Sequence, residues 1–364
     1  MSNSVVTRDL AHIHAALGPK ARAFHDQTIV ITGCAGFLGF YITRYFTEYA
    51  ETLGVRRVIA LDTFLLDRPK WLVDLANAHP SVLHLQAFDI SKDELSSVHG
   101  ATEAGFVVHG ASIASPTFYR KYPVETIDAN IWGLRNILDL YRGRDTLQGL
   151  LFFSSSEIYG DPITEAIPTP ETYRGHVSCH GPRACYDESK RFGETMAWVY
   201  AQQFGMPITV ARPFNNYGPG MRLGDKRLPA DFALAVIEGR DLVILSDGTP
   251  TRTFCYVADA VAGYLLCLLH GSYDYFNIGI DRPEIMVREL AEIYRQAGAE
   301  LFAYRGTVEY EKSEDPAYLL DNPNRRCPVI DKARSSLGYE PKILVEEGVK
   351  RYLQYLKEET EAGT

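Results

Sequence analysis

Short apolar runs alternate with longer amphipathic stretches through the first half of the chain. β-branched and aliphatic residues fill the runs, and the stretches between them repeat apolar residues every three to four positions. This alternation predicts parallel strands joined by crossover helices, which cover both faces of one sheet. The predicted strands are residues 28–32, 57–61, 82–88, 106–109, 150–154 and 208–211, and the predicted helices are 39–51, 130–141 and 186–204.

The pattern changes at both ends of this alternating region. Residues 1–25 predict an amphipathic helical extension, because Leu10, Ile13, Leu17 and Phe24 recur near helical spacing. We expect it to pack on the body of the protein or on a partner subunit. The alternating region, 26–212, is predicted to form one doubly wound α/β domain. Residues 213–364 predict a smaller, interleaved C-terminal lobe with some segments returning to the first domain; its elements are helices at 229–239, 259–269 and from 345, and a strand at 242–245.

Composition and charge narrow the class of protein. The 364 residues are 46% hydrophobic and 23% charged, which is typical of a globular chain and excludes a disordered protein or a coiled coil. The net charge is −9, and no dense basic cluster indicates nucleic-acid binding. No apolar run reaches the roughly 20 residues of a membrane span. Six scattered cysteines form no metal-binding or C-x-x-C spacing, so we expect a reduced, cytoplasmic protein without a metal.

The first strand leads into a glycine-rich turn and a helix. Gly33, Gly36 and Gly39 stand where a tight turn, a close approach to a pyrophosphate and close helix–strand packing each need a residue without a side chain. The following helix offers free N–H groups and a partial positive charge to a phosphate. The loop, which includes Phe37 and Leu38, therefore predicts a Rossmann-type dinucleotide-binding domain.

Acidic residues end the next two strands. Asp62 is placed to accept hydrogen bonds from ribose hydroxyls and to repel a 2′-phosphate, so NAD is favoured over NADP, although a turn-capping role stays open. Asp89 is predicted either to contact the adenine or to form an Asx-turn. The predicted cofactor site also includes Ile90, Ala111 and Ser154.

Tyr186 and Lys190 stand four residues apart on one face of a predicted helix. An ammonium near the phenol is expected to lower the pKa of the phenol and make Tyr186 a base near neutral pH. Hydroxyl-bearing residues follow the fifth strand at 154–156, and open α/β sheets bind ligands at that end of their strands. The two segments together predict an active site.

Four ordered motifs together resemble the extended short-chain dehydrogenase/reductase superfamily, which modifies nucleotide-activated sugars. The motifs are Thr32–Gly39, Ser154–Gly160, Tyr186–Lys190 and Arg212–Pro219. The resemblance implies that Ser155 joins Tyr186 and Lys190 as the catalytic triad. It also implies a bound NAD that takes a hydride from sugar C4 and usually returns it.

Further segments resemble the UDP-glucuronate decarboxylases (UDP-xylose synthases) of that superfamily. They are Ser156–Glu157, Gly181–Arg191, His109–Tyr119 and Thr251–Val257. The resemblance implies decarboxylation of UDP-glucuronate to UDP-xylose. It gives as catalytic residues Ser155, Glu157, Tyr186, Lys190 and Arg252, and as substrate-binding residues Ser115, Tyr119, Ser156, Asn215, Arg227 and Arg252.

Several alternatives stay open. Arg252 is expected to hold either the sugar carboxylate or the diphosphate, and Arg326 either touches the nucleotide or forms a surface charge pair. A nucleotide-sugar 4-epimerase, a 4,6-dehydratase of the same family, or more remotely a non-catalytic NAD sensor would also fit, because Ser178, Ser189 and residues 316–324 depart from the decarboxylase pattern. The resemblance further implies a homodimer built from the helices that begin near residues 130 and 186, where Met196, Val199 and Tyr200 face either the partner or the core.

Overall fold

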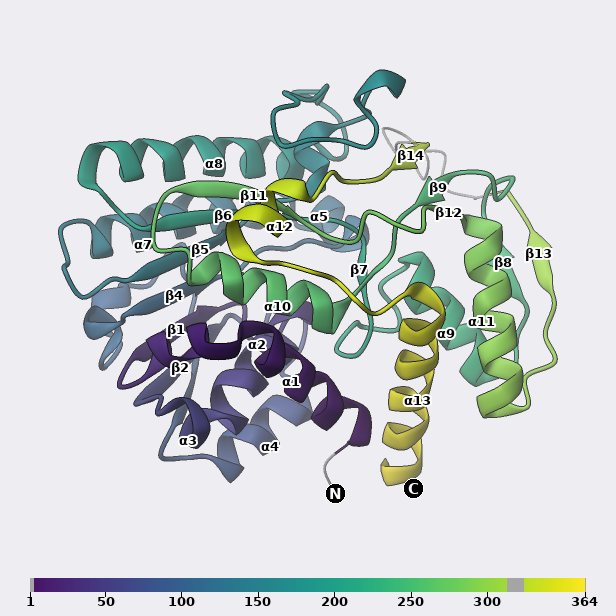
Figure 1. Cartoon of the computed structure of the whole chain (residues 1–364), viewed down its shortest axis with the longest axis horizontal. Coiled ribbons are helices and arrows are strands. Elements are labelled where there is room, and N and C mark those ends of the chain that lie inside the picture. Colours follow the sequence, from purple (N-terminus) through teal and green to yellow (C-terminus); the bar gives the residue numbers. More distant parts are fainter. Residues whose placement is uncertain (1–2, 313–323, 364) are drawn as a thin grey trace.

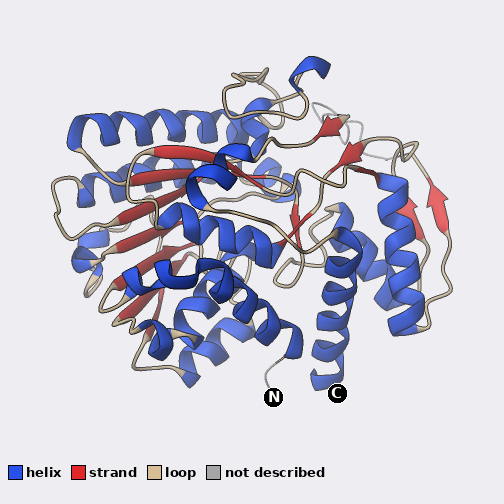
Figure 2. Cartoon of the chain, viewed as in Figure 1, coloured by secondary structure: helices blue, strands red, loops and turns tan. Residues whose placement is uncertain are grey.

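A seven-stranded parallel sheet forms the centre of the protein, with helices on both faces (Figure 2). The computed structural model describes residues 3–312 and 324–363, so all but the last residue of the divergent segment 316–324 lies outside the described residues. The strands follow the order β3-β2-β1-β4-β5-β6-β11, which is the order of dinucleotide-binding sheets extended by one strand. The predicted fold class is therefore confirmed. The strands are β1 (Thr28–Thr32), β2 (Arg57–Asp62), β3 (Leu83–Ala87), β4 (Phe106–His109), β5 (Gly149–Phe153), β6 (Ile208–Pro213) and β11 (Asp274–Ile278).

The two faces of the sheet are covered by different helices. On β1, Ile29 and Ile31 belong to the core cluster that contains residues of α2 (Phe37–Glu48) and α10 (Val257–Leu268). Val30 between them belongs to the opposite cluster, with residues of α7 (Leu134–Tyr141) and α8 (Ala184–Phe204). Successive side chains of a strand point to opposite faces, so a run that is buried throughout needs both layers.

The structure differs from the predicted elements in places that periodicity does not reveal. The predicted helix 130–141 begins as a π-helical turn over Ala129–Gly133, which turns Asn130 inward so that its amide donates to Ser189 Oγ at 2.8 Å. Strand β11 was not predicted, because Asp274 and Asn277 interrupt the apolar pattern of its sequence. The prediction also missed six helices, one of them 16 residues long: α3 (Ala50–Leu53), α4 (Lys70–Ala78), α5 (Pro116–Lys121), α6 (Pro123–Asp128), α11 (Val287–Phe302) and α12 (Asp331–Leu337).

The smaller lobe lies beyond the carboxyl ends of the strands, on the right of Figure 1. It contains the helices α9 (Leu228–Glu238), α11 (Val287–Phe302) and α13 (Val345–Gly363). Short strands join its loops: β8 (Leu242–Ile244) with β13 (Val308–Tyr310), β9 (Thr251–Arg252) with β12 (Ile285–Met286) and β14 (Arg325–Arg326), and β7 (Asn216–Tyr217) with β10 (Cys255–Tyr256). Between these segments the chain returns to the sheet as α10, β11 and α12 (Asp331–Leu337).

The N-terminal extension forms helix α1 (Ser4–Leu17) and a 3₁₀ turn (Gly18–Phe24), and it packs on the body of the same chain. All four predicted apolar positions are buried. Helix α1 lies over α10, so every residue of α10 is buried between the sheet and a further helical layer. The start of α1 and the end of α13 lie side by side (Figure 1), joined by a hydrogen bond of 2.8 Å from the Ser4 amide to Glu358.

A buried carboxylate attaches the extension to three other elements. Asp9 of α1 accepts hydrogen bonds from the hydroxyls of Tyr41 and Tyr256, both at 2.6 Å, and from Arg351 Nη1 at 2.9 Å. Burial raises the pKa of Asp9, and its three donors act in the opposite direction. Because these donors come from α2, β10 and α13, one side chain connects the extension to both parts of the chain.

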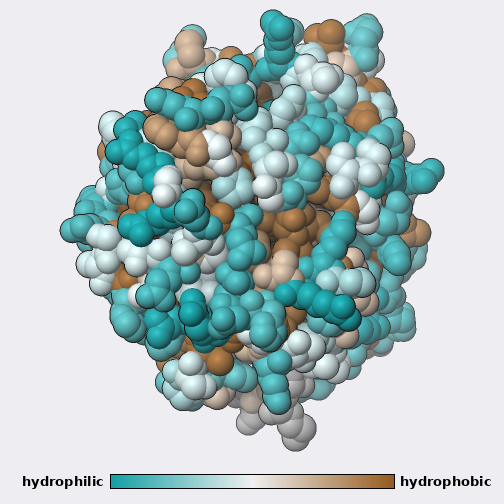
Figure 3. Space-filling view, turned by 60° about the vertical axis from the view of Figure 1, so that its left-hand side comes forward, coloured by the Kyte–Doolittle hydropathy of each residue, from teal (hydrophilic) through white to brown (hydrophobic). Residues whose placement is uncertain are grey.

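The surface is consistent with the acidic composition. Figure 3 shows a face that is largely hydrophilic, with hydrophobic residues visible near its middle. Among the described residues, no helix combines the length and the apolar character that crossing a membrane requires.

We predict that Asp9→Ala lowers the free energy of unfolding by about 3–5 kcal/mol, because Arg351 Nη1 and two buried hydroxyls lose their acceptor, and Arg351 keeps only Glu347 among the described carboxylates. Asp67→Ala is the control, since this exposed carboxylate lies 4.0 Å from Arg222 and should contribute less than about 1 kcal/mol. Denaturant unfolding of both variants checks the prediction, and equal losses would contradict it.

Candidate active site

The backbone of the glycine loop packs so closely at two glycines that a side chain there would collide with it. Gly33 has a φ of +75°, and a Cβ there would lie 2.5 Å from the Gly110 carbonyl carbon. A Cβ on Gly39 would lie 2.5 Å from the Cys34 carbonyl oxygen. Helix α2 begins at Phe37, two residues earlier than predicted, and its N-cap, Gly36, offers no side chain to its free amides. A pyrophosphate fits these amides, so the loop suits the predicted dinucleotide.

Asp62, at the end of β2, holds the glycine loop in place by a hydrogen bond. Its carboxylate accepts from the amide of Ala35 at 3.0 Å and from the amide of Phe64 at 2.9 Å. It therefore caps a turn, as the alternative interpretation held, and also touches the glycine loop where a ribose is expected. Burial raises the pKa of Asp62, and its backbone hydrogen bonds oppose that shift.

The other predicted cofactor residues differ in whether their polar groups already have a hydrogen-bond partner within the protein. Asp89 forms the Asx-turn, accepting from Ser91 and pairing with Lys92 at 2.9 Å, and the carbonyl of Ile90 accepts from Asn136 at 2.9 Å. The amide of Ala111 donates to Thr32 at 3.3 Å. The buried hydroxyl of Ser154 has no hydrogen-bond partner among the described residues, so it is the one of these groups best placed to take a ligand.

Tyr186, Lys190 and Ser155 meet at the carboxyl end of β5. The hydroxyl of Ser155 accepts from the Glu157 amide at 3.2 Å and lies near enough to the phenol of Tyr186 to favour its ionised form. Lys190 Nζ donates to the Phe153 carbonyl at 2.7 Å and lies 5.7 Å from the centre of the Tyr186 ring. All three side chains are buried. The helix places Tyr186 and Lys190 on one face, as their spacing predicted.

The expected lowering of the phenol pKa by Lys190 is wrong for the protein as described. Burial raises the pKa of Tyr186 to about 12, against the hydrogen bond with Ser155. Burial also lowers the pKa of Lys190 to about 7, so the ammonium is only partly charged near neutral pH. Desolvation thus dominates both groups.

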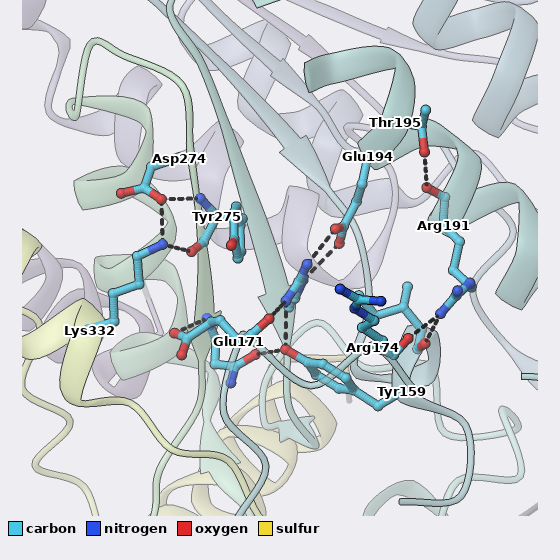
Figure 4. A network of polar contacts seen from close by, with 12 residues as sticks. Tyr159, Glu171, Arg174, Arg191, Glu194, Thr195, Asp274, Tyr275 and Lys332 are labelled. Atoms are coloured by element: carbon cyan, nitrogen blue, oxygen red, sulfur yellow. Dashed lines mark hydrogen bonds and ion pairs between the residues drawn. The ribbon is translucent and has the colours of Figure 1, made fainter. Parts of the chain in front are cut away.

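A network of polar contacts, shown in Figure 4, fixes the segment that follows β5. Arg212 donates to the Glu194 carboxylate at 2.8 and 2.6 Å, and to the Tyr159 hydroxyl at 2.8 Å. The Tyr159 hydroxyl in turn donates to Asn277 Oδ1 at 2.7 Å, and the backbone N–H of Asn277 donates to the Glu171 carboxylate at 3.0 Å. These contacts join β6, α8 and β11 to the strand end, so the motif residue Arg212 positions the site from outside it.

Arginines surround Glu157 on the substrate side. Glu157 pairs with Arg183, and Arg326 donates to both of its oxygens at 2.7 and 2.8 Å. Arg252 stands opposite Arg326 in the register of β9 and β14, and donates to the carbonyls of Thr251 at 2.7 Å and residue 324 at 3.0 Å. Arg326 therefore forms a charge pair, and the pair is mostly shielded from solvent, since the side chains of Arg326 and Glu157 are 11% and 18% exposed. We call Glu157, Arg183, Arg252 and Arg326 the arginine cluster.

The electrostatics of the arginine cluster follow from burial and from the number of positive charges. Burial opposes ionisation of Glu157, but Arg326, Arg183 and Arg252 outweigh it and hold the pKa of Glu157 below its usual value. Burial and the neighbouring Arg326 lower the pKa of Arg252 to about 9. Sequence analysis assigned no role to Arg183, although it lies in a quoted motif, because spacing alone does not show which carboxylate an arginine meets.

Two of the remaining predicted substrate residues, Tyr119 and Arg227, lie near Tyr186. The ring of Tyr119 stacks on Tyr186, with centres 5.2 Å apart and an angle of 14° between the rings. Arg227 lies over the Phe37 ring at 5.5 Å, and its charge acts on the phenol of Tyr186. Asn215 donates its amide to the Thr253 carbonyl at 2.9 Å, while Ser115 and Ser156 are buried.

Comparison with known proteins identifies the family. Residues 29–279 match the model of the NAD dependent epimerase/dehydratase family. The chain belongs to this family. Membership confirms the resemblance drawn from the motifs, and it confirms NAD as the cofactor that the glycine loop predicted.

Relatives and solved structures cover nearly the whole chain. The chain is 35% identical to UDP-glucuronic acid decarboxylase 3 of Arabidopsis thaliana, over 89% of this chain and 87% of the relative. It is 34% identical to UDP-glucuronic acid decarboxylase 1 of Xenopus tropicalis, over 92% of this chain and 73% of the relative. The crystal structure of UDP-glucose 4-epimerase from Thermotoga maritima superposes with a TM-score of 0.77 at 25% identity, covering 92% of this chain and 99% of that one.

We predict that Gly39→Ala weakens NAD binding at least about tenfold, a loss of 1.4 kcal/mol or more, because the added Cβ displaces the loop backbone. Gly224→Ala is the control, since a Cβ there meets nothing within 4 Å. Calorimetric titration of both variants with NAD measures the effect. Unchanged affinity in Gly39→Ala would show that the loop does not hold the pyrophosphate.

Proposed function

We propose that this protein decarboxylates UDP-glucuronate to UDP-xylose with NAD bound as its cofactor. The observation that carries the proposal is the buried arginine cluster beside Ser155 and Tyr186. The similarity over about nine-tenths of the chain to proteins named UDP-glucuronic acid decarboxylase supports the same substrate.

Charge explains why the arginine cluster suits a uronate. Three guanidinium groups lie around the carboxylate of Glu157, and burial together with the neighbouring Arg326 lowers the pKa of Arg252. A ligand carboxylate beside Arg252 would stabilise its positive charge in this largely buried position. Arginine also holds carboxylates through paired hydrogen bonds. We infer that Arg252 takes the carboxylate of the sugar.

The chain's own residues then account for the chemistry. NAD, when bound, accepts a hydride from C4 of the sugar and later returns it. Tyr186 accepts the proton of the C4 hydroxyl in its phenolate form, which a protonated Lys190 stabilises, while Ser155 holds that oxygen by a hydrogen bond. The C4 ketone makes the sugar a β-keto acid, so the C5–C6 bond breaks, carbon dioxide leaves and the electrons pass to the ketone. C5 then gains a proton, C4 is reduced and Tyr186 returns its proton to O4.

A 4-epimerase that acts on the same uronate is the second candidate. The arginine cluster and Ser155–Tyr186 would also bind a uronate in that enzyme, and only the fate of the carboxylate differs. A 4,6-dehydratase is less favoured, since Ser156 stands where those enzymes carry the acidic proton donor.

Proton NMR of the protein with UDP-glucuronate and NAD tests the proposal. We expect the anomeric signal of UDP-xylose to appear together with carbon dioxide. A change to UDP-galacturonate without gas release would instead identify a 4-epimerase. If neither product forms, UDP-glucuronate is not the substrate and both candidate functions are wrong.

We predict that Tyr186→Phe lowers kcat by about 10²–10⁴-fold, because the variant lacks the group that moves the C4 hydroxyl proton. Tyr310→Phe is the matched control, as this exposed tyrosine lies in β13 of the lobe. The same NMR assay measures both rates, and full activity in Tyr186→Phe would remove Tyr186 from the mechanism.

We also propose that the protein forms a homodimer through the helices next to the site, and that it acts in the reducing cytoplasm. Its six cysteines are all unpaired thiols, which supports that compartment. Met196 and Tyr200 are buried in the core and do not serve the interface, whereas Val199 is exposed. Apolar side chains gather on adjoining helical segments, and monomers rarely expose such patches: Val124, Ile127, Trp132, Phe192, Trp198 and Val199.

We predict that Trp132→Asp converts the dimer into a monomer, because it places a charge in the middle of this apolar surface. Leu344→Asp is the control, since this leucine is also exposed but precedes α13. Size-exclusion chromatography with light scattering measures the masses. A monomeric wild type, or a dimeric Trp132→Asp, would contradict the proposed interface.

A further inference from the structure

A second buried carboxylate lies next to Tyr186. The side chain of Asp187 is only 8% exposed, and its Oδ1 has no hydrogen-bond partner among the described residues. Its Oδ2 lies 3.5 Å from Arg183 Nε, a long contact compared with those that Glu157 receives. Asp187 is therefore close to the arginine cluster but poorly neutralised by it.

Asp187 also lines a cavity of about 100 Å³. Arg183 and Ala184 also line it, as do the exposed loop residues His176, Ser178 and His180. The cavity thus brings polar groups of a solvent-facing loop together with a carboxylate of the active-site helix. Its size and polar lining suit a few water molecules.

The two carboxylates have opposite environments. The pKa of Glu157 lies below its usual value because three arginines outweigh its burial. Burial and the negative charge of Glu157 raise the pKa of Asp187 to about 7, and Arg183 and Arg326 only partly offset this. A pair of carboxyl groups separated in this way commonly divides the acid and base roles of an active site.

The proposed reaction needs a proton that Tyr186 does not supply. Tyr186 takes a proton from O4 during oxidation and returns it to O4 during reduction, so its balance is zero. Loss of carbon dioxide from the carboxylate form leaves an electron pair that C5 must share with one added proton. Each turnover therefore consumes one proton from another acid.

The neighbouring groups are poorly suited to this task. Glu157 is ionised, and arginines release their protons too weakly to act as acids. His109 is held neutral, because burial and Lys190 lower its pKa to about 3. Lys190 also has a pKa of about 7, but it donates to the Phe153 carbonyl and does not line the cavity beside Asp187 through which a proton could be returned.

We propose that Asp187 supplies the proton that C5 receives after decarboxylation, and that the adjoining cavity returns a proton to it from solvent. This inference rests on the proposed function. The proton leaves the Asp187 carboxyl group and reaches C5 through water in the site, which restores the C4 ketone for reduction. Water in the cavity then reprotonates the carboxylate, so one proton enters for each carbon dioxide released.

Single-turnover measurements on the NAD-loaded enzyme separate protonation from the earlier steps. With Asp187→Asn we expect carbon dioxide to be released at the wild-type rate, while UDP-xylose forms about 100-fold more slowly. Reduced cofactor, followed at 340 nm, should persist over the same interval, because C4 cannot be reduced until C5 is protonated. Asp187→Glu should restore part of the rate. A purely structural role would slow both products together.

Two further variants complete the test. Val177→Trp narrows the cavity without touching Asp187, and it should also delay UDP-xylose relative to carbon dioxide. Glu188→Gln, the neighbouring exposed carboxylate, should change neither rate. Equal slowing of both products in Asp187→Asn, or no slowing, would overturn the inference while leaving the proposed function intact. Failure of the wild type to form UDP-xylose would instead overturn the proposed function.

Discussion

The pairing of Glu157 with Arg183 and Arg326 is the interaction on which the site depends. The carboxylate follows β5, Arg183 caps the start of α8, and Arg326 belongs to a strand of the smaller lobe. A buried carboxylate needs positive partners, and each buried arginine needs a negative one. Formation of these ion pairs therefore holds the end of the sheet, the active-site helix and the lobe against one another. A ligand that contacts all three must lie at this point.

Around that cluster, some residues only hold neighbouring elements together, and others are placed to contact a ligand. Arg212 and Tyr159 use all of their visible contacts to connect strands and helices, and they leave the ligand side to others. Ser154 and Tyr119 behave in the opposite way, because their buried hydroxyls have no partner among the described residues. Unsatisfied polar groups in a buried site are expensive, so their presence marks the surface that a ligand completes.

Much of this was predictable from sequence, and the failures have physical causes. Periodicity and β-branched runs predicted six of the seven strands of the central sheet. The glycine loop was placed correctly because Gly33 and Gly39 stand where the backbone leaves no room for a Cβ. Strand β11 was missed because tertiary contacts, not its own pattern, hold Asp274 and Asn277 in place. Arg183 and Asp187 were missed as functional residues because their environments arise from segments far apart in the chain. The pKa of Tyr186 was misjudged because the spacing to Lys190 says nothing about desolvation.

The complete burial of α10 has a consequence for how the protein opens. All twelve of its residues lie between the sheet and α1, so no local fraying exposes its backbone. Amide hydrogens in such a helix exchange with solvent only when a larger cooperative unit opens. Since α1 packs over α10, and Asp9 is among the residues that hold it there, α10 stays covered for as long as the extension is in place. The extension thus protects the innermost helix from exchange, although it lies at the far end of the sequence.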